Sequence, residues 1–221
     1  MKNINRAILE AHLLESKQYF RGCLLNAGCG DNTYEYLYKN TIERQVRFDW
    51  PLTQHGHSYI DAYGSVMELP FANESFDCIL CTEVLEHVPE PLKTLKEFNR
   101  VLKKDGTLIL TVPFLHQVHE HPHDYFRYTY YGLIYILKQA DLNIVAMRAR
   151  GELLAVTFFF IRKTFFRLLS RIIGSRLCSK LPWLLIDTFY LKIFRKKIFK
   201  LNPEQTSYTL GYTIVARKAN E

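Results

Sequence analysis

The chain has 221 residues, of which 48% are hydrophobic, and a formal net charge of +7. This length accommodates one α/β domain with an appendage, and the apolar share supplies a full core. Residues 1–20 are polar, helical in pattern and without an apolar stretch, so we expect a helix here and no secretory signal peptide.

The cysteines point to a reducing compartment. Four of the five lie on or beside predicted buried strands, where we expect reduced thiols (Cys23, Cys29, Cys78 and Cys81). The C-x-x-C spacing of Cys78 and Cys81 is no metal or redox signal on a strand, because residues three apart point to opposite faces.

Residues 23–32, CLLNAGCGDN, read as a short apolar strand that runs into a glycine turn. Glycines permit backbone angles and a close approach that a side chain would block. A helix is expected from about Thr33, and an apolar-to-acidic step ends at Asp49. A strand, a Gly-x-Gly turn and an acid about twenty residues later are typical of a nucleoside-binding half-unit. Thr33 stands where a dinucleotide fingerprint needs its third glycine, which favours a smaller anion.

Residues 69–113 continue the alternation of strands and helices. The run 78–81 predicts a buried parallel strand, Pro91 opens a helix over 91–104, and 107–112 forms the next strand. Residues 143–148 predict a sixth strand and 208–218 a last one.

The loop after the fifth strand, residues 113–132, holds four of the eight histidines together with Asp124, Arg127 and several tyrosines. Three interpretations stand beside one another: a zinc site, a polar acceptor pocket with a histidine base and Arg127 for an acidic group, and a lid whose polar groups satisfy each other. The spacing H-x-x-H-x-H-x-H matches no structural zinc pattern, so we predict no metal site here.

Residues 153–201 form an insert that carries a net charge of +10, so the rest of the chain sums to −3. Ile161, Phe165, Leu168 and Ile172 make an apolar stripe at helical spacing, with basic residues opposite. No uncharged run here is long enough to span a bilayer, whereas a basic amphipathic helix suits a membrane surface. A helical cap over the acceptor pocket, a dimer interface and a nucleic-acid surface are the alternatives.

Six phrases now occur in a recognisable order between Cys23 and Val145: LLNAGCG, FDW, LPF, SFDCILCTEVLEHV, FNRVLKKDGTLILTVPF and YGLIYILKQADLNIV. With them the chain resembles the class I S-adenosylmethionine-dependent methyltransferases of the type 11 domain group. The resemblance implies an α/β fold: a Rossmann-like, doubly wound seven-stranded sheet with an antiparallel last strand. The expected domains are an N-terminal helix (1–20), a methyltransferase domain (21–152 and 202–221) and the basic insert before the last strand (153–201).

The resemblance also implies S-adenosyl-L-methionine as cofactor and assigns residues to it. The methionine moiety falls to Asn26, Ala27, Gly28, Cys29 and Gly30, with Glu83 at its end. Asp49 is expected to hold the ribose, and the adenine falls to Trp50, Ser65, Val66 and Met67. Asn26 and Ser65 replace acids that the family commonly has at these positions.

The residues of the acceptor side are predicted only from their place in the sequence, just after the predicted fourth and fifth strands. The candidate catalytic residues are His121, Asp124 and His87, and the candidate acceptor-binding residues are His116, His119, Tyr125 and Arg127. The expected function is methyl transfer to a small or lipid-linked acceptor, such as a glycan or glycolipid precursor. We expect a cytoplasmic protein, peripheral on the inner face of an anionic membrane, with a homodimer as a further expectation.

Two other function classes remain open at this point. A nucleic-acid methyltransferase is disfavoured, because TEVLEH follows the fourth strand where amino-methylating enzymes carry an acid or Asn before Pro-Pro, and no Pro-Cys pair occurs. The other class is a catalytically silent scaffold that binds S-adenosylmethionine.

Overall fold

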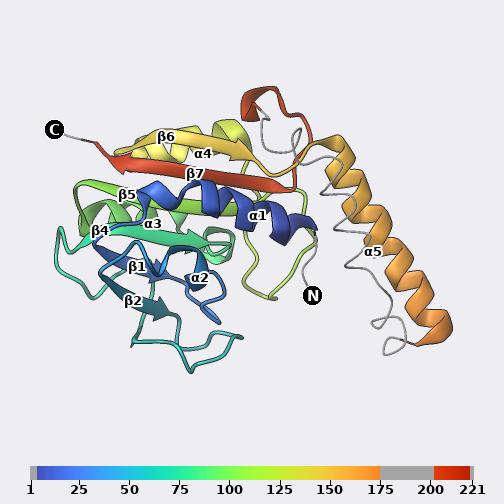
Figure 1. Cartoon of the computed structure of the whole chain (residues 1–221), viewed down its shortest axis with the longest axis horizontal. Helices are drawn as coiled ribbons and strands as arrows, with labels where there is room; N and C mark the ends of the chain where they lie inside the picture. The colour runs from blue at the N-terminus through green and yellow to red at the C-terminus, as the bar shows by residue number, and fades with distance from the viewer. Residues whose placement is uncertain (1–3, 175–201, 220–221) are drawn as a thin grey trace.

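The computed structural model describes residues 4–174 and 202–219, and its strands form one seven-stranded sheet in the order β3-β2-β1-β4-β5-β7-β6 (Figure 1). The strands are β1 (Cys23–Ala27), β2 (Arg44–Asp49), β3 (Ala62–Tyr63), β4 (Phe76–Thr82), β5 (Leu102–Pro113), β6 (Leu142–Ala149) and β7 (Gly211–Lys218). β7 runs antiparallel to both β5 and β6, and the other pairs are parallel. The predicted fold class is confirmed.

The helices cover both faces of the sheet: α1 (Ile4–Glu15) and α2 (Glu35–Tyr38) on one, α3 (Pro91–Val101) and α4 (Tyr130–Gln139) on the other (Figure 1). Short 3-10 turns lie at Lys17–Tyr19, Leu85–His87 and Pro203–Gln205. Side chains alternate across the strands, so Leu24 packs in the core under α1 whereas Leu25 packs in the core under α3. Cys78 and Cys81 divide between the same two cores, and burial raises the pKa of the Cys78 thiol to about 12.

α5 (Leu153–Ile173) leaves the sheet after β6 and extends along one end of the molecule (Figure 1). Its first turns pack on the start of α1 through a small separate core of Ile4, Ile8, Ala155, Val156 and Phe159. Residues 175–201 lie outside the described residues, and they make up more than half of the predicted insert. The proposed division into a helix, a domain and an insert therefore stays a prediction. Within the described ranges, no helix combines the length and the apolar character that crossing a bilayer requires.

Two expected helices differ in extent from the structure. The helix expected from about Thr33 begins at Glu35 and has a single turn, because Asn32 adopts a positive φ of 49° and its side chain is buried below the turn. The helix expected over 91–104 ends at Val101, because Leu102 already pairs with Phe76 as the first residue of β5.

His12 on α1 makes acid stability testable. Its side chain is fully buried, Nδ1 lies 3.2 Å from the Thr213 hydroxyl on β7, and burial with nearby Arg150 and Arg148 lowers its pKa to about 3. Unfolded chains take up this proton near pH 6.5, so the folded state loses stability as the pH falls toward 3, by about 1.4 kcal/mol per pH unit.

We therefore expect His12→Gln to have a shallower loss of unfolding free energy between pH 6.5 and pH 4 than the wild type. Urea titrations at each pH measure this slope for both proteins. Equal slopes would show that His12 does not carry the acid sensitivity.

Candidate functional site

The glycine turn lies at the carboxyl end of β1, against β2. The amides of Gly28 and Cys29 both donate to the carbonyl of Phe48, at 2.8 and 3.1 Å. Gly28 has a φ of +71°, and a Cβ placed on it would overlap the Cγ2 methyl of Val84. Glycine is thus required here both by backbone angle and by space.

Asp49 is the last residue of β2 and braces the turn. Its two carboxylate oxygens accept the Gly30 amide at 2.6 Å and the Trp50 amide at 2.7 Å. A carboxylate has about four lone-pair directions, so two hydrogen bonds leave acceptor capacity for ligand hydroxyls. The side chain lines the cavity described below, where sequence reasoning expected a ribose contact.

A buried polar network holds the turn from below. The Asn26 amide donates to Asn32 Oδ1 at 3.0 Å and lies 3.3 Å from the Tyr38 hydroxyl, and Gln45 donates to the same two acceptors. Asn26 therefore orients the residues after the turn through neutral hydrogen bonds. Burial raises the pKa of the Tyr38 hydroxyl, which keeps the phenol protonated as a donor to Asn32 Oδ1 at 3.3 Å.

A cavity of about 770 Å³ opens at the carboxyl ends of β1, β2 and β4. This is the switch point of the strand order, where open α/β sheets bind ligands, and the volume lies within the usual range for small-molecule sites. Its lining includes all the predicted cofactor residues except Ala27, which is buried in the core: Asn26, Gly28, Cys29, Gly30, Asp49, Trp50, Ser65, Val66, Met67 and Glu83.

Glu83 follows β4 with a φ of +53° and is held at the cavity wall by two donors. Its Oε1 accepts the Thr111 hydroxyl at 3.0 Å and Arg150 Nη2 at 2.8 Å. Arg150 is fully buried and also donates to the carbonyl of Val112 at 2.6 Å. Sequence reasoning missed Arg150, because nothing local distinguishes it from Arg148 two residues earlier.

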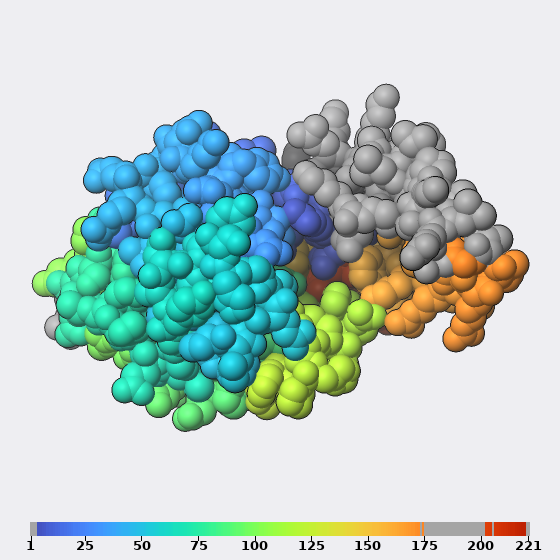
Figure 2. Space-filling model, turned by 90° about the horizontal axis from the view of Figure 1, so that it is seen from below, coloured from blue at the N-terminus to red at the C-terminus, as the bar shows by residue number. Residues whose placement is uncertain are grey.

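The loop 114–129 closes the other side of the cavity. In Figure 2 it lies beside the segment near residues 50–60, and the rings of Trp50 and His123 meet edge to face at 5.1 Å. The amides of Tyr125 and Phe126 both donate to the carbonyl of Glu86, at 2.8 and 3.2 Å, which fastens the loop to the turn after β4.

The predicted acceptor residues separate into two groups. His87, His119, His121 and Tyr125 line the cavity, whereas His116, Asp124 and Arg127 are absent from its described lining. Arg127 holds Asp124 through two hydrogen bonds of 2.6 and 2.7 Å, and this pairing keeps the pKa of the Asp124 carboxyl well below its usual range. The pair braces the loop, so its geometry favours a positioning role over direct contact with an acceptor.

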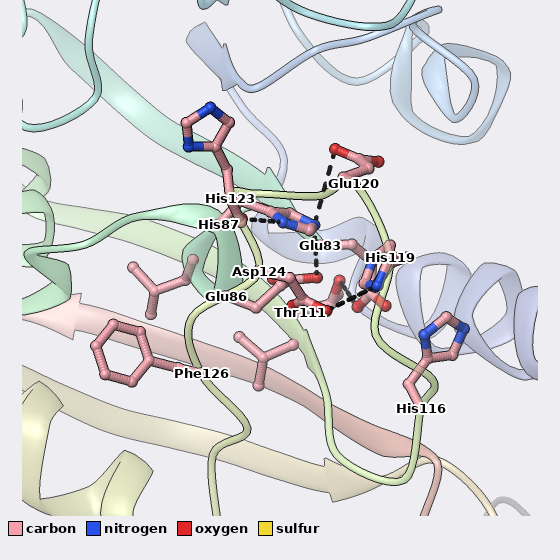
Figure 3. Close-up of polar contacts among 12 residues, drawn as sticks. Glu83, Glu86, His87, Thr111, His116, His119, Glu120, His123, Asp124 and Phe126 are labelled. Carbon is pink, nitrogen blue, oxygen red and sulfur yellow. Dashed lines mark hydrogen bonds and ion pairs between the residues drawn. The ribbon is translucent and has the colours of Figure 1, made fainter.

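His87 and Glu86 lie at the centre of the group of predicted acceptor residues (Figure 3). His87 Nδ1 donates to the carbonyl of His123 at 2.7 Å, so its Nε2 carries the lone pair in the neutral ring. Glu86 has no exposed surface, and burial with nearby Glu83 raises the pKa of its carboxyl well above the usual range. Sequence reasoning also missed Glu86, although a charged residue inside the apolar run VLEHV was a signal for it.

Comparison with known proteins agrees with this geometry. Residues 25–110 match the methyltransferase domain family. Over these 86 of the 221 residues the chain is similar to class I S-adenosylmethionine-dependent methyltransferases. A solved methyltransferase from Archaeoglobus fulgidus, described as dependent on S-adenosylmethionine, aligns over 96% of this chain and 94% of that chain. Its TM-score of 0.58 at 16% identity shows the shared fold.

Two curated relatives match smaller parts of the chain. An uncharacterized protein of Methanocaldococcus jannaschii is 36% identical over 100 residues, which are 44% of this chain and 43% of that protein. The demethylmenaquinone methyltransferase of Alkalihalophilus pseudofirmus is 43% identical over 47 residues, or 21% of this chain and 20% of that enzyme. The chain thus spans less than half the length of these curated relatives.

The residues at this cavity fit S-adenosylmethionine, the cofactor that the matched family implies. The turn at Gly28 leaves no room for a side chain, Asp49 retains acceptor capacity beside it, and both line one cavity of sufficient volume. The carboxylates of Asp49 and Glu83, which can accept hydrogen bonds from hydroxyl or ammonium groups, are therefore available at the same wall.

Proposed function

We propose that the protein transfers a methyl group from S-adenosylmethionine to a small or lipid-linked acceptor, such as a glycan or glycolipid precursor, next to a membrane surface. The observation that carries this proposal is one cavity that joins a nucleoside-binding half, built around Gly28 and Asp49, to a histidine-rich half from the loop 114–129. The cofactor supplies a methyl group already activated on a sulfonium. The protein then contributes mainly by holding the acceptor atom in line.

In the cofactor half, the roles follow from position along the cavity wall. Asn26 to Gly30 would hold the methionine moiety with Glu83 at its end, and Asp49 the ribose. Ser65, Val66 and Met67 would flank the adenine, where the Ser65 hydroxyl already accepts the Met67 amide at 3.1 Å. Trp50 is 42% exposed at the opposite rim, where stacking on a purine would cover it.

In the acceptor half, an imidazole that lines the cavity can take a proton from a neutral acceptor oxygen. His121 and His87 both line the cavity, and His121 has an exposed side chain on the loop. We assign the proton to His121 because the His87 ring is tied at Nδ1 and lies deeper, with a side chain 13% exposed.

His121→Ala is therefore expected to lower methyl transfer by at least about a hundredfold and to leave cofactor affinity within about twofold. The assay counts labelled methyl transferred from S-adenosylmethionine to a membrane-fraction extract, with His57→Ala as a surface-histidine control. Unchanged transfer would remove His121 from the mechanism. Label in nucleic acid would favour the nucleic-acid alternative, and no label despite cofactor binding would favour a silent scaffold.

Two observations support a lipid-linked acceptor. The demethylmenaquinone methyltransferases among the relatives are named for an isoprenoid quinone, although they share only part of the domain with this chain. The loop 114–129, which supplies residues to the proposed acceptor half of the cavity, also lies on the side of the molecule from which α5 extends (Figure 1).

The exposed stripe of α5 is the proposed membrane contact. Ile161, Phe165, Leu168 and Ile172 are 63%, 54%, 54% and 80% exposed, one turn apart along the helix. Apolar side chains in such a stripe, with basic residues beside them, suit the boundary of an anionic bilayer. The basic cluster Arg195–Lys197 lies outside the described residues.

In the proposed contact, the wild-type side chains of Phe165 and Leu168 enter the acyl boundary of the membrane. We therefore expect the double variant Phe165→Asp, Leu168→Asp, which places two charges there, to lose most of its binding to anionic vesicles. Co-flotation with phosphatidylglycerol vesicles measures the bound fraction, and circular dichroism checks that both proteins are folded. Equal flotation of the variant and the wild type would contradict a membrane role for this stripe.

A further inference from the structure

Three potential metal ligands converge from two separate segments at the floor of the acceptor half (Figure 3). Glu86 and His87 follow β4, and His119 comes from the loop after β5. One ligand atom from each side chain lies within 4.8 Å of the other two. The loop histidines gave no zinc pattern in the sequence, because the other two ligands are more than thirty residues away along the chain.

Glu86 is an unusual carboxylate. It has no exposed surface, and neither of its oxygens accepts a hydrogen bond from the part of the chain that the structure describes. A buried polar group without a partner is costly, and a buried charge costs more unless a cation or donors compensate it. The nearest ring nitrogen is His87 Nε2, at 3.7 Å from Glu86 Oε1. The carboxylate is thus directed at the cluster and unsatisfied there.

The two histidines have the outer contacts that metal-bound imidazoles commonly show. His87 donates Nδ1–H to the His123 carbonyl, and its Nε2 is a buried atom without a hydrogen-bond partner among the described residues. His119 has the Asp124 carboxylate 3.4 Å from its Nδ1, and Asp124 is itself held by Arg127. Such outer partners fix the ring orientation and raise the basicity of the ligand nitrogen.

We propose that Glu86, His87 and His119 bind one divalent transition-metal ion, with Zn²⁺ as the reference case. Two imidazoles and one carboxylate with an open position form a donor set for Zn²⁺ or Fe²⁺. Bonds of about 2.0–2.2 Å would draw the three ligand atoms about 1 Å closer together. Glu120 Oε2, 3.9 Å from His87 Nε2, is placed to become a fourth ligand.

The ion would face the cavity, because His87, His119 and Glu120 all line it. A ligand position left open there could be taken by an oxygen of the acceptor. That role rests on the proposed function, whereas metal binding itself does not.

The test uses the full-length protein after exhaustive dialysis against a chelator and then buffer. Titration with ZnCl₂ by calorimetry is expected to give one ion per chain. Glu86→Gln, which keeps the shape of the side chain and removes its charge, and His119→Ala should each weaken binding at least tenfold. His57→Ala, a histidine outside the cluster, should bind as the wild type does.

Absence of stoichiometric Zn²⁺ binding by the wild type would overturn the proposal, as would equal affinity in Glu86→Gln and His119→Ala. If Glu86→Gln fails to fold, His119→Ala decides, because it truncates a partly exposed side chain on a loop. S-adenosylhomocysteine titrated into the metal-free protein keeps the two proposals distinguishable. Binding of that ligand without binding of Zn²⁺ would remove only the metal site.

Discussion

Gly28→Ala is expected to lower the affinity for S-adenosylhomocysteine at least about a hundredfold and the free energy of unfolding by about 2–4 kcal/mol. The added Cβ would overlap Val84, a β-branched side chain with little rotamer freedom, and alanine is disfavoured at a φ of +71°. The turn would have to shift away from Val84, which distorts the hydrogen bonds of Gly28 and Cys29 to Phe48.

Gly174→Ala is the matched control for backbone strain. Gly174 has a φ of +80°, and a Cβ there would meet no heavy atom within 4 Å among the described residues. Calorimetry and urea denaturation of both variants separate the two effects. If Gly28→Ala bound the ligand as well as Gly174→Ala does, the turn would not be part of the cofactor site.

Arg150→Ala should destabilise the protein by about 3–5 kcal/mol, because it leaves Glu83 without the buried cation that holds it. Arg150 has no exposed surface, and its Nη2 joins Glu83 at the cavity wall to the carbonyl of Val112 on β5. The same loss frees Glu83 to move, so we also expect weaker binding of S-adenosylhomocysteine. Urea denaturation at pH 7 measures the first effect and calorimetry the second.

Arg148→Ala provides the comparison on the same strand. Arg148 pairs with Glu15 at 3.3 Å, and both side chains are more than one third exposed. Such surface pairs contribute about 0–1 kcal/mol, so this variant should stay close to the wild type. Comparable losses of unfolding free energy in the two variants would show that the buried pair of Arg150 and Glu83 stabilises the protein no more than the surface pair does.

Much of the fold could be predicted because its signals are local. The apolar runs that became β1, β4 and β5 are each bounded by turn residues, and the order of strands and helices fixed the sheet. Helix ends were harder to predict. The single turn of α2 depends on Asn32, whose side chain finds partners in Tyr38 and Gln45 only after folding.

The two proposed halves of the site also differ in whether their signals are local in the sequence. The proposed cofactor half lies in contiguous motifs, so the cavity-lining residues around Gly28 and Asp49 could be named from the sequence. The acceptor half depends on contacts between distant segments. Arg127 was expected to bind an acceptor, but its partner is Asp124, and Arg150 reaches Glu83 across 67 positions of the chain. No periodicity or spacing carries that information.

Calorimetric titration of the folded, full-length protein with S-adenosylhomocysteine tests the central claim most directly. The structure predicts one ligand per chain with a dissociation constant in the micromolar range, about −8 kcal/mol, and loss of that signal in Gly28→Ala. A folded wild-type protein that produces no binding heat with millimolar ligand would contradict the assignment of this cavity to S-adenosylmethionine.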